Sequence, residues 1–307
     1  NDLEYITSLN LDNKNITSLN GLEYCKNLVN LSLANNTISD LTPLSNLTTL
    51  QSLNLKENKI SDISPLCNLV NLKVLNLYNN QITDITTVNN FRNLISLSLA
   101  YNSITALTAI SNLTNLEYLN LANNEISDIY PIRNLTNLTT LNLMNNNIIN
   151  LTNLKCLTKL NSISLSGQKL ILPNESCYRT LSISNPIIGV NNTPITNITD
   201  ISSSGTYNNS TNSIEWNNIK NDATLSFKFN EEVQIGNAKG NFSGLVSKSI
   251  TFKDVIVDIP DKNLRDAILT KSNKKLTDNV TTNDLEFLTV LNLNNCNITS
   301  LKGLEYC

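Results

Sequence analysis

The first half of the chain repeats itself every 22 residues. An isoleucine returns at that interval at Ile16, Ile38, Ile60, Ile82, Ile104, Ile126 and Ile148. Two leucines separated by one residue precede each isoleucine at a constant spacing, as Leu31 and Leu33 precede Ile38. The shared pattern LxxLxLxxNxI predicts eight repeats over residues 1–172, which stack into a mainly β solenoid with the shape of a curved rod.

Each repeat is expected to depend on its neighbours. The Leu-x-Leu step has the period of a β-strand, so both leucines point to the same side of the chain. A single 22-residue repeat buries too little apolar surface to offset the entropy lost when its backbone becomes ordered. Stacked repeats share their core and their strand hydrogen bonds, which explains why the pattern recurs.

An asparagine stands two residues before the isoleucine in six repeats: Asn36, Asn58, Asn80, Asn102, Asn124 and Asn146. An Asn amide both donates and accepts hydrogen bonds. We therefore expect this column to have a structural role, pairing backbone groups where each coil turns, and not to bind a ligand. Lys14 and Gln168 replace the asparagine at the two ends, where we expect the column to fail for lack of a neighbour.

An aspartate follows the isoleucine by two residues in four repeats: Asp40, Asp62, Asp84 and Asp128. Each precedes a segment with the residues of a short helical turn, and a carboxylate there is expected to act as an N-cap for the free amides of that turn. A ladder of metal-binding carboxylates is the alternative interpretation of the same column.

The composition argues against catalysis. The 307 residues include no histidine, which removes every His-based nucleophile pair and every His metal ligand, and no glycine-rich phosphate-binding motif occurs. We therefore expect no enzyme activity and no cofactor. A net charge of −3 gives no reason to expect a nucleic acid partner, and no apolar run is long enough for membrane insertion in this segment. Without a start Met or a basic leader, the chain is expected to begin inside a domain, with export signals outside it.

The repeats resemble the leucine-rich repeats of the internalin family, the surface proteins through which some Gram-positive bacteria engage host receptors. The same 22-residue pattern also occurs in intracellular repeat proteins that regulate phosphatases. The repeats alone do not choose between the two.

Residues 173–253 lose the period and gain short alternating segments such as "ATLSFKF", which predict a small β-sandwich. The segments "SGTY", "LSFKF", "VQIG" and "FSG", together with Trp216, resemble the immunoglobulin-like domain that follows internalin repeats. The resemblance favours an internalin-like chain over a phosphatase regulator. Trp216 is expected to be a core residue of this sandwich.

Residues 254–307 are predicted to open a second unit. Leu264, Ala267 and Ile268 have helical spacing and Asp261 offers a first-turn charge, which resembles the small helical cap of internalins. The next stretch, residues 283–307, matches residues 1–25 at 19 of 25 positions. We expect a parent of tandem cap–repeat–sandwich units, or one with only two units. The first repeat then lacks a cap in this chain, so head-to-tail self-assembly is possible.

Six cysteines occur without metal-binding or redox spacing. Cys25 falls on a leucine column and is expected in the core. We expect free thiols, with a Cys156–Cys177 disulfide as the alternative.

The candidate binding residues lie on the concave side of the rod, where the residues flanking the two strand leucines point outward. Most are small and neutral, and the exceptions are Lys56, Glu57, Tyr78, Tyr101, Tyr118 and Met144. Tyr and Met are residue types that supply interface energy. Isolated exposed aromatic residues are also common without function, and this alternative stays open.

Together these observations predict a non-catalytic binding or adhesion protein, extracellular or on the cell surface of a Gram-positive-type bacterium. Its partner would be a protein, either a host receptor or a neighbouring copy of itself, although a glycan is possible. A structural fibre or stalk of head-to-tail units and an intracellular scaffold are the alternatives.

Overall fold

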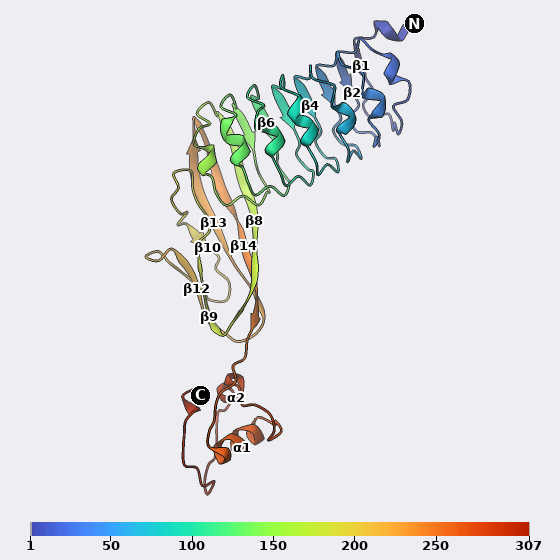
Figure 1. The fold of residues 1–307 in the computed structure, drawn as a ribbon. Coiled ribbons are helices and arrows are strands. Elements are labelled where there is room, and N and C mark those ends of the chain that lie inside the picture. The colour runs from blue at the N-terminus through green and yellow to red at the C-terminus, as the bar shows by residue number, and fades with distance from the viewer. Residues whose placement is uncertain (1, 307) are drawn as a thin grey trace.

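The computed structural model describes residues 2–306, and Figure 1 shows an elongated molecule whose two chain ends lie at opposite extremes. Its first part is a row of eight parallel strands joined in sequence order. They are β1 (Ser8–Asn10), β2 (Asn30–Ser32), β3 (Ser52–Asn54), β4 (Val74–Asn76), β5 (Ser96–Ser98), β6 (Tyr118–Asn120), β7 (Thr140–Asn142) and β8 (Ser162–Cys177).

Equivalent residues of neighbouring repeats face each other across these strands, as Leu53 does with Leu31 and Leu75. The isoleucines from Ile38 to Ile148 are all fully buried inside the stack. These observations confirm the predicted solenoid of eight repeats.

A short 3-10 turn lies in each connection between strands: Leu22–Tyr24, Thr42–Leu44, Ser64–Leu66, Thr86–Asn90, Thr108–Ile110, Tyr130–Asn134 and Thr152–Leu154, with a further turn at Asp2–Tyr5 before β1. Figure 1 shows the turns stacked beside the strands. Neighbouring strands lie about 4.8 Å apart, which is less than the width of a helical turn with its side chains. The stack is therefore shorter along its strand side than along its turn side. The strand side is therefore the concave side of the stack.

The asparagine column joins each repeat to the one before it. The Asn124 amide donates to the carbonyls of Leu121 (3.1 Å) and Ala122 (3.4 Å) in its own repeat and to that of Leu99 (3.0 Å) in the preceding repeat. Its Oδ1 accepts from the backbone N–H of Ile104 (2.9 Å). The other five asparagines of the column make the same set of bonds.

The expected failure of this column at Gln168 is wrong. The Gln168 amide donates to the carbonyls of Leu165 (2.8 Å) and Leu143 (2.9 Å), and its Oε1 accepts from the N–H of Ile148 (3.1 Å). A glutamine carries the same donors and acceptor as an asparagine, so the column continues to the last repeat.

The aspartate column also differs in detail from its prediction. The 3-10 turn at Ser64–Leu66 has Ile63 as its N-cap residue, and no side chain caps it from that position. Asp62 lies one residue earlier, and its carboxylate accepts from the N–H of Ser64 (2.8 Å). This Asx turn still pairs one of the free amides at the start of the helical turn.

The last repeat strand continues into a second β region. β8 pairs in parallel with β14 (Ala238–Phe252), which pairs with β13 (Ala223–Ile235), which pairs with β10 (Ile198–Thr199). The solenoid and this region therefore share one eleven-stranded sheet. A separate three-stranded sheet holds β11 (Thr206–Asn208), β12 (Ser213–Ile219) and β9 (Arg179–Ser184).

Apolar side chains between these two sheets join the solenoid core as one continuous cluster. The structure places Trp216 in that cluster, 1 % exposed, with its indole N–H donating to the carbonyl of Ser202 (2.9 Å). The buried indole thus has the partner it requires.

The chain ends in a small unit with its own core, which includes Val257, Ile259, Leu264 and Leu285. It contains α1 (Lys262–Lys271), α2 (Thr282–Glu286) and a 3-10 turn (Leu304–Tyr306). Glu286 connects this unit to the β region through Lys220 (2.8 Å) and Arg179 (3.4 Å). None of the helices in residues 2–306 is long and apolar enough to span a bilayer.

The described cysteines are free thiols. Cys25 lies in the solenoid core, where burial raises the pKa of its thiol. Cys156 is exposed and Cys177 is buried, and both are unpaired with any cysteine among residues 2–306. The alternative of a disulfide between them is therefore wrong.

We expect Asn124→Ala to lower the free energy of unfolding by about 2–3 kcal/mol, because it leaves buried carbonyls and a buried N–H unpaired between two repeats. Chemical denaturation measures this loss. Asn115→Ala is the matched control, since that exposed amide makes a single bond to the Arg92 carbonyl, and we expect it to cost less than about 1 kcal/mol. Equal losses would contradict the structural role of the column.

The terminal unit should weaken in acid. Backbone N–H donation from Leu264, and donation from the N–H and hydroxyl of Thr299, hold the pKa of the Asp261 carboxyl far below its usual range. The folded pKa is depressed, so the stabilisation is present above the unfolded pKa of about 3.9 and is lost as the pH falls below it. Amide exchange in α1, corrected for intrinsic rates, should show less protection at about pH 3 than at about pH 6. Asp261→Asn should reduce protection at the higher pH and remove most of this pH dependence.

Candidate functional site

The candidate site is the solvent-facing side of the strand row, which we call the strand face. Its outward positions are the first and third residues of each strand and the two residues that follow the second strand leucine. Most of these side chains are small or are asparagines that bond to nearby backbone, as Asn76 Oδ1 accepts from the N–H of Tyr78 (3.1 Å). Larger side chains interrupt this plain surface at few places.

The structure brings two of the predicted residues together. Tyr78 follows β4 and Tyr101 follows β5, and their rings meet edge to face with centroids 5.1 Å apart and an interplanar angle of 62°. Tyr101 is 48 % exposed and Tyr78 is half-buried. Edge-to-face aromatic pairs are favourable by about 0.5–1.5 kcal/mol beyond their buried area. The pair therefore fixes two rings in one orientation on the strand face.

Lys56 and Glu57 lie one repeat before this pair. Lys56 occupies in its repeat the position that Tyr78 occupies in the next, and the Glu57 backbone N–H donates to the Tyr78 carbonyl (2.7 Å). Both side chains are half-buried. By their repeat positions, the four residues lie on three successive repeats of the strand face and combine two aromatic rings with two opposite charges.

Tyr118 and Met144 do not join this group. Tyr118 is the first residue of β6, level with Ser96 and Val74, so it lies about 13 Å along the strand direction from the level of Tyr78. Met144 is level with Tyr78 but three repeats away, roughly 14 Å across the sheet. The predicted set is thus one cluster and two separate residues, and not a single patch.

Glu57 and Tyr101 share a left-handed backbone conformation, which we did not predict from the sequence. The position before the asparagine column is left-handed in all eight repeats, with φ of 78° at Gly167 and between 53° and 57° at Asn13, Asn35, Glu57, Asn79, Tyr101, Asn123 and Asn145. Asn tolerates this conformation better than other residues with a Cβ. The sequence signal for this conformation is an Asn-Asn pair, which occurs in four repeats. In two other repeats Glu57 and Tyr101 take the place of the first asparagine of the pair.

Holding Glu57 and Tyr101 in this conformation costs of order 1 kcal/mol each. Asparagines at the same position also bond across repeats, as the Asn145 amide donates to Asn123 Oδ1 (2.9 Å). A glutamate and a tyrosine do not continue that bond. The two departures from asparagine therefore lower local stability at the place where the exposed aromatic pair lies.

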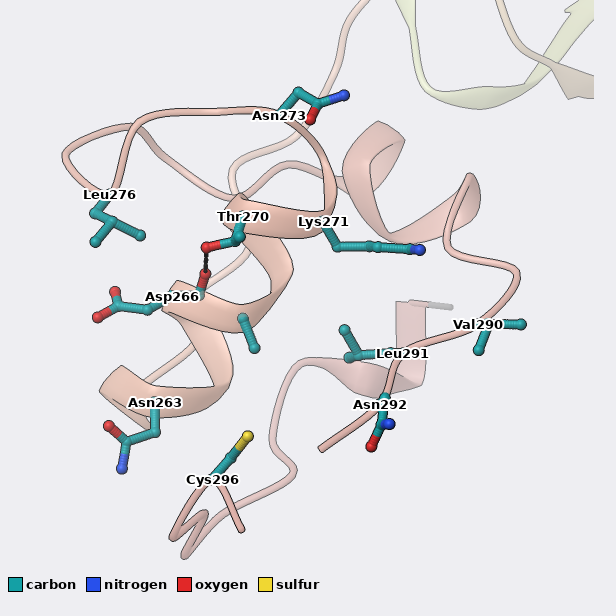
Figure 2. A pocket seen from close by; sticks show the side chains of 11 residues that line it. Asn263, Asp266, Thr270, Lys271, Asn273, Leu276, Val290, Leu291, Asn292 and Cys296 are labelled. Atoms are coloured by element: carbon teal, nitrogen blue, oxygen red, sulfur yellow. Dashed lines mark hydrogen bonds between the residues drawn. The ribbon is translucent and has the colours of Figure 1, made fainter. Parts of the chain in front are cut away.

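Residues 2–306 hold no group of three or more Cys, Asp or Glu side chains placed to bind a metal. A groove of about 860 Å³ lies elsewhere, in the terminal unit, where side chains of α1 and of residues 290–296 line it (Figure 2).

We expect Glu57→Asn to raise the free energy of unfolding by about 0.5–1 kcal/mol and the melting temperature by roughly 1–4 °C, because it relieves the left-handed strain and can extend the asparagine bonds. Thermal unfolding followed by circular dichroism measures the shift. Glu125→Asn is the control, since Glu125 has an ordinary φ and should change little. An equal shift in both variants would refute the strain argument.

Two family models match the chain. The model described as leucine rich repeats (2 copies) matches residues 48–90 and 92–134, and the model described as LRR adjacent matches residues 195–251. The comparison with curated protein sequences gives no match.

Two solved structures from Listeria monocytogenes strain 4b F2365 are similar to the chain. An internalin (inlF) is 38 % identical with a TM-score of 0.52, over 55 % of this chain and 50 % of that chain, so this chain spans half the length of that relative. Internalin C2 (inlC2) is 37 % identical with a TM-score of 0.50, over 56 % of this chain and 73 % of that chain. Because this likeness spans most of internalin C2 and comes with both the repeat and the repeat-adjacent models, the chain belongs to the internalin family of leucine-rich-repeat proteins.

Proposed function

We propose that this chain is a non-catalytic adhesion segment of a bacterial surface or secreted protein, and that it binds a partner protein on its strand face. The contact is centred on Tyr78 and Tyr101, with Lys56 and Glu57 beside them. The observation that carries the proposal is the edge-to-face tyrosine pair, in which Tyr101 is exposed and is held in a left-handed backbone conformation. Strained residues cluster at binding sites, and tyrosine is enriched among interface residues that dominate affinity.

Tyr118 and Met144 are proposed as peripheral contacts of the same partner. A partner that covers Tyr78 and Met144 together must span three repeats, roughly 14 Å. A protein surface of ordinary interface size covers such a span, since about 800 Å² is buried on each side. A glycan is the alternative ligand, which the aromatic rings could also stack against.

The proposed organisation has three parts. Residues 1–172 are the repeats, residues 173–253 an immunoglobulin-like β-sandwich, and residues 254–307 a helical cap with the first repeat of a following unit. The match of the repeat-adjacent model at residues 195–251 supports the second part. Asp261 at the N-terminus of α1, whose carboxylate accepts from the Leu264 N–H (2.9 Å), supports the third.

The proposed location is the cell surface of a Gram-positive bacterium, or its surroundings after secretion. Similarity to two internalins of Listeria monocytogenes supports this location. An intracellular scaffold, the alternative from the repeats alone, gains no support from the repeat-adjacent region that this chain shares with the internalin family.

An extracellular stalk or fibre of tandem units is a second candidate function. The observation that favours it is the near identity of residues 1–25 and 283–307, at 19 of 25 positions. In that case contacts between units are the function, and the strand face needs no partner.

A cell-binding assay separates these candidates. Fluorescently labelled chain is added to cultured animal cells and bound label is measured by flow cytometry. We expect Tyr78→Ala to weaken binding by roughly 30-fold, as for an interface residue worth about 2 kcal/mol, and Tyr118→Ala to have a smaller effect.

Tyr130→Ala is the control, because Tyr130 is a tyrosine that is 50 % exposed on a 3-10 turn away from the strand face. Equal weakening by Tyr130→Ala, or no effect of Tyr78→Ala, would refute the proposed site. Treating the cells with trypsin before the assay should abolish binding to a protein partner. Loss after glycosidase treatment alone would indicate a glycan.

A further inference from the structure

A hollow of about 500 Å³ lies where the last repeat meets the β region. We call it the junction hollow, and the residues that line it include Asn145, Lys169, Lys228, Asn230, Asn241 and Ser243. Figure 1 shows β8, β14 and β13 side by side as they leave the solenoid. Along β14 the buried Phe242 alternates with Asn241 and Ser243, which point away from the core. Because β8 belongs to both parts, the hollow lies on the outward side of one sheet, beyond the strand face.

Two glycines fix the backbone at the bottom of the junction hollow. A Cβ on Gly167 would collide with the side chain of Asn145, and a Cβ on Gly244 would collide with the Gln168 carbonyl oxygen. Just before the Gly244–Gln168 pair, β8 holds one residue more than β14, which is a β-bulge. Bulges are over-represented next to active sites, where they redirect side chains. A larger residue at either glycine would push these strands apart.

Polar side chains in the junction hollow are free of internal hydrogen bonds, unlike most asparagines of the strand face. Asn120 Oδ1, for example, accepts from the backbone N–H of Ala122 (3.2 Å). Within residues 2–306, the side chains of Asn230, Asn241 and Ser243 make no such bond to the protein. Amides and hydroxyls both donate and accept, so the hollow offers a ligand groups of both kinds.

Asn145 adds one more acceptor to the junction hollow. In the preceding pair of repeats, the Asn145 amide donates to Asn123 Oδ1 (2.9 Å). Gly167 stands where the next asparagine of this series would be, and it has no side chain that could donate. Asn145 Oδ1 therefore accepts no hydrogen bond from the part of the chain that the structure describes, and it remains free for a ligand.

One row across the sheet gives the junction hollow its charge and its apolar surface. In the strand register, Leu245 is the partner of Lys169 on β8 and of Lys228 on β13. Lys228 is paired with Asp200 (3.0 Å), whereas Lys169 forms no ion pair within residues 2–306. These three charges sum to one positive charge. Leu245 is 41 % exposed, and the methylene groups of the two lysines extend its apolar surface.

We propose that the junction hollow binds an acidic saccharide, at a site separate from the tyrosine pair and beyond the proposed function. A pyranose ring has C–H groups on its faces and hydroxyl groups around its edge. The faces match the apolar strip at Leu245, and the hydroxyls match the surrounding amides. A carboxylate on the sugar pairs with Lys169. The volume lies within the range of about 300–1,000 Å³ that is typical of small-ligand sites.

An acidic peptide fits the junction hollow less well. Extended peptides bind by adding a strand to a free sheet edge. Strands β8, β14 and β13 are each paired on both sides, so they offer no such edge. A strongly acidic peptide would also need more than one unpaired cation, and Lys169 alone supplies it here.

Titration of the ¹⁵N-labelled chain with methyl β-glucuronide tests the site by NMR. Methyl β-glucoside is the neutral control ligand, because it has the same ring without the carboxylate. We expect saturable shifts of the Asn230 and Asn241 side-chain amide signals, with a Kd in roughly the millimolar range. Lys169→Met should weaken glucuronide binding by about two- to fivefold, as for an exposed ion pair, and leave glucoside binding unchanged.

Two substitutions on β14 give a matched pair of variants. Ser243→Tyr fills the hollow and should abolish the shifts. Ser249→Tyr is the control, because Ser249 is exposed on the same side of the same strand and does not line the hollow. Titration with 3′-sialyllactose, measured against lactose, tells a sialic acid ligand from a uronic acid ligand.

Failure of both acidic sugars to bind, or binding that survives Ser243→Tyr, would overturn the proposal. So would equal binding of glucuronide and glucoside, or tighter binding of a triglutamate peptide. If circular dichroism shows that Ser243→Tyr does not fold, the comparison of the two glycosides with Lys169→Met decides, since that side chain is exposed. Tyr78→Ala should bind glucuronide unchanged, which separates this test from that of the strand face.

Discussion

The structure depends on the hydrogen bonds that each repeat receives from the next one. The Asn102 amide donates to the Leu77 carbonyl (3.0 Å) and accepts from the Ile82 N–H (2.9 Å), both in the preceding repeat. Without the following repeat these buried backbone groups would lack partners, at a cost of about 1–3 kcal/mol each. No repeat is complete alone, so the solenoid is stable only as a series. Both of its ends therefore need a structure that is not another repeat.

At the far end that structure is the β region. β8 is at once the last repeat strand and the first strand of that region, pairing with β7 on one side and β14 on the other. Gln168, inside β8, still pairs the turn of the previous repeat. The 22-residue period thus stops near residue 172 without ending the strand. One sheet and one core run through the junction.

Much of this was predictable from spacing, because residues with identical spacing in a stack have identical surroundings. The leucine, isoleucine and asparagine columns could be read directly, and the duplicated segment identified two copies of one element. The parallel pairing of β8 with β14 could not be predicted from the sequence, because it joins residues about 75 positions apart in segments without a repeat. The Tyr78–Tyr101 contact also escaped prediction, since it depends on a left-handed backbone that a tyrosine does not signal.

That backbone conformation bears on where the proposed site lies. The turn after each strand must enter the left-handed region to bring the next asparagine inward, and every described repeat obeys this requirement regardless of its side chain. An asparagine satisfies it at little cost and points its amide along the stack. A tyrosine at the same position costs stability, but it points a rigid ring outward beside the ring of the preceding repeat. The repeats fold cooperatively, so the stability of the other repeats allows the repeat that contains Tyr101 to carry this backbone strain.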